Sequence, residues 1–219
     1  MLDAVMAVVA VLAGAVATFV FQRWRSEQER RDVLLKRYLA QLQEACESLW
    51  YRLRNLAYER ADTVTSPEYL VTTTMYTLGS ALGMERMLAL EGLYPEIWRH
   101  FPALKSILRR RAVDSAVAAI TKKKTELQHY DRVALAEAVV ERNGESLRQS
   151  TFLEFRRRVD QGPEQEWWQP ARKAIASLKN SQDAVAPLMS ELKMLAIAIG
   201  SATKMESPLD HESDPGRQP

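Results

Sequence analysis

Residues 35–56, LKRYLAQLQEACESLWYRLRNL, carry the strongest periodic pattern in the chain. Apolar residues recur there at alternating spacings of four and three: Leu35, Leu39, Leu42, Cys46, Leu49, Leu53 and Leu56. This spacing predicts an α-helix with one apolar face, packed either in a coiled coil with a second copy or in an intramolecular bundle. Trp50, Tyr51 and Tyr58 widen the apolar surface beyond a narrow seam, which favours the bundle.

Upstream of this seam, residues 4–21 form an unbroken apolar run, AVMAVVAVLAGAVATFVF. At about 1.5 Å per residue, a helix of this length reaches roughly 27 Å, close to the roughly 30 Å hydrocarbon thickness of a bilayer. Ala15-Val16-Ala17 also fits the cleavage site of a signal peptide, but no Lys or Arg precedes the run and apolar residues continue to Phe21. We therefore expect a retained transmembrane anchor over residues 1–22, followed by a stalk over residues 23–34.

Flanking charge predicts the orientation of this anchor. Residues 23–38 hold six basic and three acidic side chains, whereas residues 1–3 contain no basic side chain. The positive-inside rule then places the N-terminus outside and the remainder in the cytoplasm, at the inner membrane of a bacterium. The lone Cys46 is consistent with a reducing compartment.

Small residues within the run suggest one further contact. Ala10, Gly14 and Thr18 recur every four positions, which would allow two anchors to pack closely in a homo-oligomer.

The rest of the chain predicts an all-α fold, with a helical bundle over residues 35–202 and a disordered tail over residues 203–219. Its composition is rich in Ala, Leu, Arg, Glu and Gln, and no long alternation typical of strands is present. Ser66-Pro67-Glu68 supplies a cap, a proline and an acid for a second helix that ends near Glu91. We expect an irregular connection over 92–102, a helix after it that reaches Lys124, and helices over 131–141, 150–159, 163–180 and 183–201.

Two glycines in the second helix point to a close approach of another group. Gly79 and Gly83 remove two side chains from one face, although each glycine costs a helix up to about 1 kcal/mol relative to alanine. Close helix packing is the favoured interpretation, and a cleft for a ligand beside them is the alternative.

No known catalytic or cofactor motif is present in the sequence. It lacks a P-loop, a dinucleotide glycine pattern and a CxxC pair. Glu126 and His129 form an E-x-x-H step, but a di-iron bundle needs a second such step and two more carboxylates. Cys46 lies on the leucine seam, where apolar surroundings weaken a thiol nucleophile. We expect no catalytic residues, no metal and no cofactor, and an enzyme is the less favoured class.

The segment 99–124 concentrates basic charge, with eight Lys or Arg against Asp114 alone. Solvated side chains are the simplest interpretation, and contact with anionic lipid is the alternative, because basic residues near a leaflet are attracted to it. Nucleic acid is not expected, since no aromatic residues alternate with these charges. The candidate lipid contacts are Arg109, Arg110, Arg111, Lys122, Lys123 and Lys124.

Two stretches resemble a family of uncharacterised bacterial proteins with one N-terminal span and a cytoplasmic helical domain. They are residues 38–58, with the step Arg52-Leu53-Arg54-Asn55, and residues 69–86, with Leu82-Gly83-Met84. The family has aromatic residues before a Gly-Trp pair, which Ala81-Leu82 and Met84 replace here. The resemblance implies the anchor and the helical domain, and it implies no activity.

Together these patterns predict a membrane-anchored scaffold, adaptor or regulatory subunit that works through protein contacts. A small-ligand binder or enzyme that uses the Gly79/Gly83 region, and an anionic-lipid binder, are the alternatives.

Overall fold

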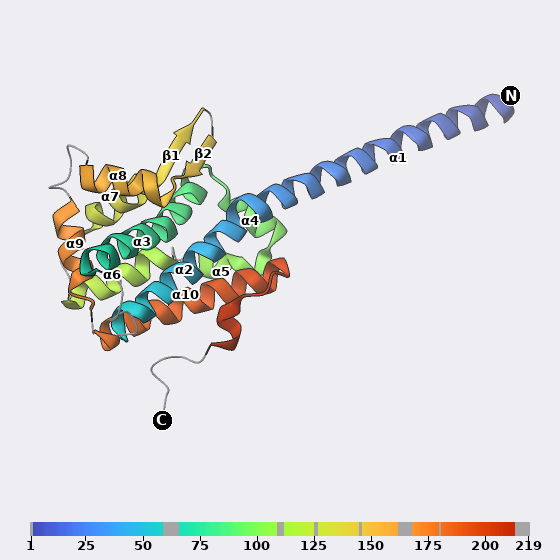
Figure 1. The fold of residues 1–219 in the computed structure, drawn as a ribbon. Coiled ribbons are helices and arrows are strands. Elements are labelled where there is room, and N and C mark those ends of the chain that lie inside the picture. The colour runs from blue at the N-terminus through green and yellow to red at the C-terminus, as the bar shows by residue number, and fades with distance from the viewer. Residues whose placement is uncertain are drawn as a thin grey trace.

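The computed structural model describes residues 2–58, 66–108, 112–124, 127–144, 146–161, 168–179 and 181–212. Within these ranges, the side chains of 2–11, 13, 119–124, 143, 146 and 161 are not part of the description. The described chain is mostly helical, as the all-α prediction requires. Figure 1 shows a helical bundle from which one long helix, α1 (Leu2–Val33), projects.

A continuous helical rod connects α1 to the bundle. A π-helical turn, η1 (Leu34–Leu39), joins α1 to α2 (Ala40–Ala57), and no glycine or proline interrupts residues 15–66. The wide turn brings Leu34 and Leu39, five residues apart, to the same buried side, with 5% and 0% exposure. Leu35, the predicted first residue of the seam, is only partly buried as a result.

The leucine seam is buried within this single chain. From Leu39 to Leu56 every seam residue is at most 2% exposed: Leu39, Leu42, Cys46, Leu49, Leu53 and Leu56. Leu39 ends η1 and the others lie on α2, which packs against α3 (Pro67–Leu90) and α10 (Gln182–Thr203). The intramolecular bundle is therefore confirmed, and a coiled coil with a second copy is wrong for this seam.

The second helix begins and ends as predicted. Ser66 caps α3, and its Oγ accepts a hydrogen bond from the backbone N–H of Tyr69 at 3.2 Å. Gly79 and Gly83 lie against α7 (His129–Val139). A Cβ on Gly79 would lie 2.8 Å from the carbonyl oxygen of Leu135, so close helix packing is confirmed here. α7 occupies the space directly beside these glycines.

Residues 92–102, predicted to be irregular, contain a helix. The chain forms α4 (Tyr94–His100), the short turn η2 (Pro102–Leu104) and α5 (Lys105–Leu108), and α6 (Ala112–Lys124) follows. Pro95 lies in the first turn of α4, where a proline is tolerated because the first helical N–H groups need no partner. Ile97 is fully buried and fastens α4 to the core.

The predicted helix over 131–141 ends early, and a hairpin follows it. β1 (Val140–Asn143) pairs antiparallel with β2 (Ser146–Gln149), so that Val140 lies opposite Gln149. Gly144 has a φ of +62°, a left-handed conformation that glycine adopts without strain. α7 begins with a capping box, in which the Asp131 carboxylate accepts a hydrogen bond from the Gln128 backbone N–H at 2.8 Å.

The remaining helices match their predicted positions in part. α8 (Phe152–Gln161) buries Phe155 and Val159. α9 (Gln169–Ala176) lies within the predicted 163–180 and ends before residues 177–179, while 163–167 and 180 lie outside the described residues. Among the residues searched, α10 is the one helix that is long and apolar enough to cross a membrane. However, α10 packs against α2 and α6 and buries a stripe inside the bundle: Val185, Leu188, Met189, Leu192, Leu195 and Ile199.

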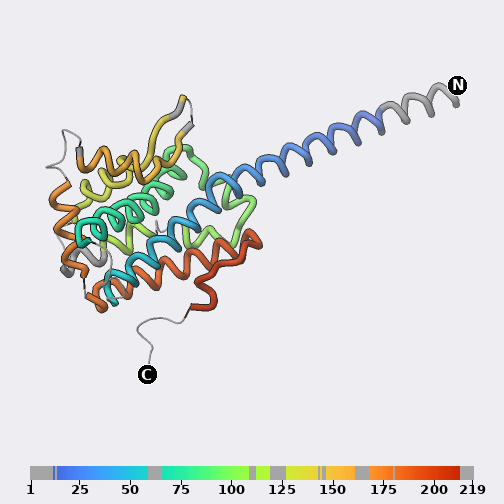
Figure 2. Tube along the Cα trace, viewed as in Figure 1, coloured from blue at the N-terminus to red at the C-terminus, as the bar shows by residue number. Residues whose placement is uncertain are grey.

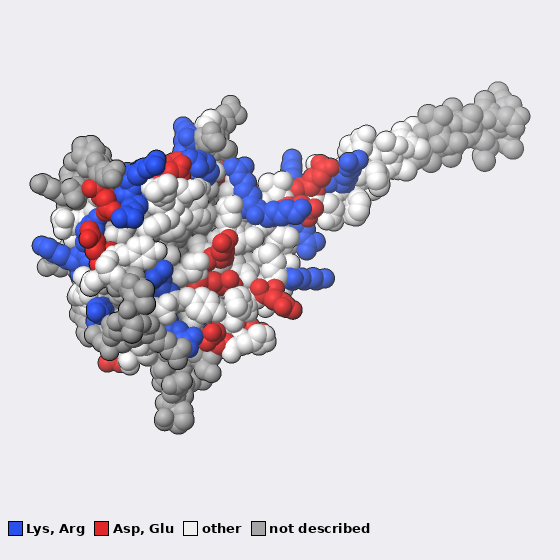
Figure 3. All heavy atoms as spheres, in the orientation of Figure 1, with Lys and Arg blue, Asp and Glu red and all other residues white. Residues whose placement is uncertain are grey.

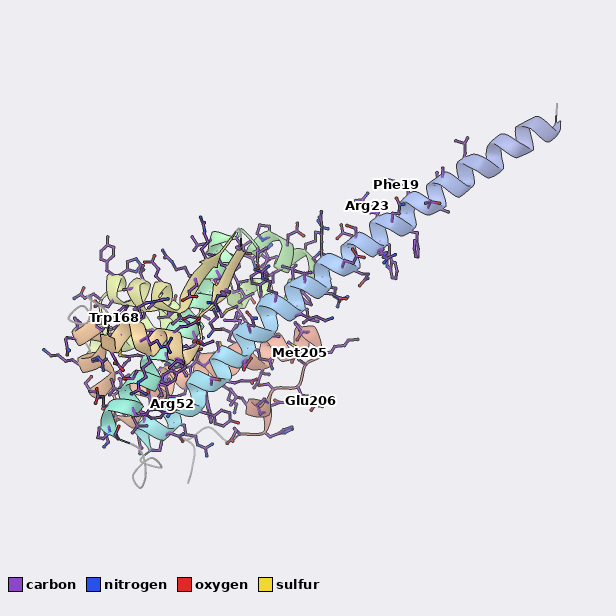
Figure 4. All side chains as sticks on the ribbon, turned by 45° about the horizontal axis from the view of Figure 1, so that its top comes forward. Phe19, Arg23, Arg52, Trp168, Met205 and Glu206 are labelled. Atoms are coloured by element: carbon purple, nitrogen blue, oxygen red, sulfur yellow. The ribbon has the colours of Figure 1, made fainter. Side chains whose placement is uncertain are left out.

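The predicted disordered tail is wrong for residues 204–212, which fold back onto the bundle. Lys204 has a φ of +61° and reverses the chain, and the turn η4 (Pro208–His211) buries Leu209 completely. Gly200 permits this path, because a Cβ there would lie 2.5 Å from the carbonyl oxygen of Met205. Arg54 then pairs with Glu212 at 2.7 Å. Figure 4 shows Met205 and Glu206 beside the bundle, and Figure 2 shows the whole path of the chain. Residues 213–219 lie outside the described part.

Candidate functional site

The projecting part of α1 exposes large apolar side chains. Those of Phe19, Phe21 and Trp24 are 64%, 59% and 56% exposed. Figure 4 shows Phe19 and Arg23 on the length of α1 that has left the bundle. Thr18, whose Oγ1 donates to the Gly14 carbonyl at 2.8 Å, leaves no unpaired hydroxyl on this surface. The surface is therefore chemically suited to a hydrocarbon environment.

Below this apolar length, the stalk is fastened to α4. Glu27 accepts a short hydrogen bond from Arg99, and the His100 Nε2 lies 3.6 Å from the same carboxylate. The hydrogen bond from Arg99 lowers the pKa of Glu27 and raises that of Arg99. Arg31 lies over the Phe101 ring, with its guanidinium carbon 5.4 Å from the ring centroid. We call these contacts the stalk latch.

The π-helical turn also anchors the hairpin. The Tyr38 hydroxyl donates to Glu91 at the end of α3, and Arg37 donates to the Leu147 carbonyl in β2 at 3.1 Å. The other oxygen of Glu91 accepts from the Leu147 N–H at 3.4 Å. Burial, followed by the hydrogen bond to Glu91, raises the pKa of Tyr38 to about 12. The π-helical turn, the end of α3 and the hairpin are thus held together by these hydrogen bonds.

A cleft of about 310 Å³ opens between α3, α6 and α7. Glu85, only 4% exposed, lies on it and accepts hydrogen bonds from the backbone N–H groups of Val113 at 2.9 Å and Asp114 at 3.1 Å. A carboxylate is stabilised by such contacts at the start of a helix. The lining residues are Leu82, Glu85, Arg86, Ala89, Leu90, Asp114, His129, Arg132, Val133 and Ala136.

Two arginines complete the charged part of this cleft. Arg132, whose side chain is 10% exposed, donates through Nε to Asp114 at 2.8 Å. Arg86 donates to Glu137, while its buried Nε has no partner. The cleft is thus lined by both acidic and basic side chains as well as apolar ones. The cleft can therefore hold a polar group in a fixed orientation, but it contains no hydroxyl or thiol nucleophile.

The predicted lipid-contact side chains all fall outside the described part of the structure. Arg109, Arg110 and Arg111 lie outside the described residues, and Lys122, Lys123 and Lys124 belong to α6 with side chains that are not described. Of the anchor residues, Gly14 has no heavy atom within 4 Å of an added Cβ, and the side chain of Ala10 is not described.

The residues weighed for chemistry lie apart or outside the described residues. Cys46 is fully buried, and desolvation raises its pKa well above the usual range of a thiol. His129 is exposed, and Glu126 falls outside the described residues. Within the residues searched, no group of three or more His, Cys, Asp or Glu side chains is placed to hold a metal ion.

The sequence interpretation did not identify the cleft or the stalk latch. Glu85 and Arg86 are the only charged residues between Leu70 and Leu90 of α3, so an acid in an otherwise apolar helix was the available signal. Glu27 and Arg99 are far apart in sequence, and no local pattern joins them.

Comparison with protein-family models, curated proteins and solved structures finds no match for this chain. The resemblance to uncharacterised bacterial membrane proteins therefore stays a prediction.

Proposed function

We propose that this protein is a single-span protein of the bacterial inner membrane, with its N-terminus outside and its bundle in the cytoplasm. The observation that carries the proposal is the exposed apolar length of α1, since nothing else in the described chain covers Phe19, Phe21 and Trp24. Half of residues 4–21 have side chains outside the description, and for these the proposal rests on the sequence. Six basic residues over 23–38 support the orientation.

We further propose that the bundle works through protein contacts, as a scaffold, adaptor or regulatory subunit. Two large apolar side chains on its surface are exposed, those of Tyr69 and Leu153. Leu153 follows the partly buried Phe152 in sequence, and Tyr69 lies beside Phe152 in space. The ring centroids of Tyr69 and Phe152 lie 6.1 Å apart. Aromatic and apolar residues of this kind supply much of the binding energy of protein interfaces.

Orientation is tested with single cysteines and a membrane-impermeant maleimide on the full chain. We expect Lys173→Cys to react only in inverted vesicles and Asp3→Cys only in intact spheroplasts. Native Cys46 is fully buried and does not compete. The reverse pattern of labelling would contradict the orientation.

Protein contact is tested with a photo-crosslinking amino acid at Leu153, and at Lys173 as the matched exposed control. We expect a discrete crosslinked product from membranes at position 153 and none at 173. Equal or absent crosslinking at both positions would refute the proposed surface.

A second candidate function is the binding of a small ligand in the cleft beside Glu85. The observation that favours it is the partly buried pairing of Arg132 with Asp114 on a cleft of about 310 Å³, since paired charges in clefts are frequent at binding sites. Native mass spectrometry of the detergent-solubilised chain tests it. A small molecule retained by the wild type and lost in Ala89→Trp supports this function, and its absence from both contradicts it.

A further inference from the structure

The stalk latch determines how far the bundle lies from the membrane. Arg99 contacts Glu27, which is only six residues beyond Phe21, the last residue of the apolar run. At about 1.5 Å per residue this separation is roughly 9 Å along the helix. Headgroups extend roughly 5–8 Å beyond the hydrocarbon on each side of a bilayer. If residues 4–21 span the bilayer, α4 therefore lies just beside the headgroups, on their cytoplasmic side.

The rod is built to keep this distance. Residues 15–66 contain no glycine or proline, and α1 continues through η1 into α2 without a break. The latch adds a second attachment, through Glu27 to Arg99 and through Arg31 to Phe101. The bundle therefore cannot swing away from the membrane about the stalk without breaking these contacts.

Other elements lie at the same end of the bundle. Figure 1 shows α4, the hairpin β1–β2 and the C-terminal end of α10 at the end from which α1 leaves, while α9 lies at the opposite end. Near α4, the Lys105 ammonium lies 5.9 Å from the centroid of the Trp98 ring, and Trp98 stacks on Tyr94. Such aromatic and basic pairs are typical of a membrane interface.

Charge is unevenly divided between this end and the rest of the chain. Residues 23–37, 94–108 and 140–149 hold ten basic and six acidic side chains, out of 30 and 28 in the whole chain. The remainder therefore holds 20 basic and 22 acidic side chains. In Figure 3, Lys and Arg side chains lie among Asp and Glu side chains where α1 meets the bundle.

We infer that this end of the bundle, formed by the stalk, α4 and the hairpin, lies against an anionic lipid surface. The inference rests on the proposed function, because it requires α1 to span. Electrostatic attraction acts within a Debye length of about 8 Å at physiological ionic strength, which the position of α4 satisfies. Each basic residue near such a surface strengthens the attraction about fivefold. The membrane then acts as a second partner that fixes which faces of the bundle remain free.

The experiment uses the full chain in vesicles of phosphatidylcholine, with or without one quarter phosphatidylglycerol. A fluorophore is attached at Ala103→Cys, exposed beside α4, or at Lys179→Cys beyond α9, and is quenched by a spin label on the lipid headgroups. We expect at least twofold stronger quenching at position 103 than at 179, increased further by phosphatidylglycerol. Equal quenching at both positions would overturn the inference.

Charge reversal separates electrostatic contact from proximity alone. Lys105→Glu with Arg142→Glu should remove the increase that phosphatidylglycerol causes, whereas the matched reversal Lys173→Glu with Lys179→Glu, both exposed at the far end, should preserve it. If both pairs behave alike, the inference is wrong. Flotation of the same samples tests the anchor separately, because a chain that does not float with vesicles contradicts the proposed function itself.

Discussion

The contact between Gly79 and α7 gives a sharp test of the bundle. Replacing a helical glycine with alanine ordinarily stabilises a helix by up to about 1 kcal/mol. At Gly79, however, the new Cβ would lie 2.8 Å from both the Leu135 carbonyl oxygen and Val139 Cγ2. Because the carbonyl belongs to the backbone, α7 must shift as a unit, and overpacking of this kind costs about 1–3 kcal/mol.

We therefore expect Gly79→Ala to lower the free energy of unfolding by about 1–2 kcal/mol after the helix gain is subtracted. Urea unfolding of the full chain in detergent, followed by the fluorescence of buried Trp50 and Trp168, measures this change. Gly83→Ala is the matched control, since its Cβ would meet the rotatable Val140 side chain at 3.1 Å and the Ala136 carbonyl at 3.2 Å. The free energy of unfolding of Gly83→Ala should fall clearly less than that of Gly79→Ala. An increase in stability for Gly79→Ala would refute the packing of α3 on α7.

Three further predictions concern the other contacts described above. Gly200→Ala should cost about 1–3 kcal/mol in urea unfolding, because its Cβ would meet the Met205 carbonyl, whereas the exposed Ser201→Ala should change stability by less than about 0.5 kcal/mol. Glu85→Ala should cost about 2–4 kcal/mol, since the Val113 and Asp114 N–H groups lose their acceptor, and a neutral effect would contradict the capping role. The folded-state pKa of Tyr38, about 12, lies above its ordinary value near 10, so its stabilising contribution is complete below pH 10 and is lost as the pH rises to 12. Tyr38→Phe should remove up to about 2–3 kcal/mol of that alkaline loss, and an unchanged pH profile would contradict the burial of this hydroxyl.

Those parts of the fold that depend on local pattern were predictable. The seam from Leu39 to Leu56 and the cap at Ser66 follow from spacing and side-chain chemistry close in sequence. The close approach of α7 at Gly79 was also predictable, because two glycines four residues apart on a helix usually allow another helix to pack closely.

Other parts depend on contacts between distant residues, and the sequence patterns missed them. The strands Val140–Asn143 and Ser146–Gln149 are too short for a period-two pattern, and Glu91 and Arg37 hold β2 in place from other elements. Leu209 stands alone in a polar segment, so its burial depends on the path that Gly200 permits.

The same reason explains the candidate sites. The apolar run of 4–21 predicts an anchor, but the proposed distance of α4 from the membrane depends on the pairing of Glu27 with Arg99. The cleft requires α3, α6 and α7 to converge on Glu85. A single buried acid in an apolar helix was its one visible sign.

Alkaline extraction of membranes tests the central claim most directly. Sodium carbonate at high pH releases peripheral proteins and leaves spanning proteins in the pellet. The full chain should remain in the pellet, while a variant with Val9→Glu, Val11→Glu and Val16→Glu should appear in the supernatant, because a charge at the bilayer centre costs several kcal/mol. Release of the full chain into the supernatant would contradict the membrane-spanning role of α1.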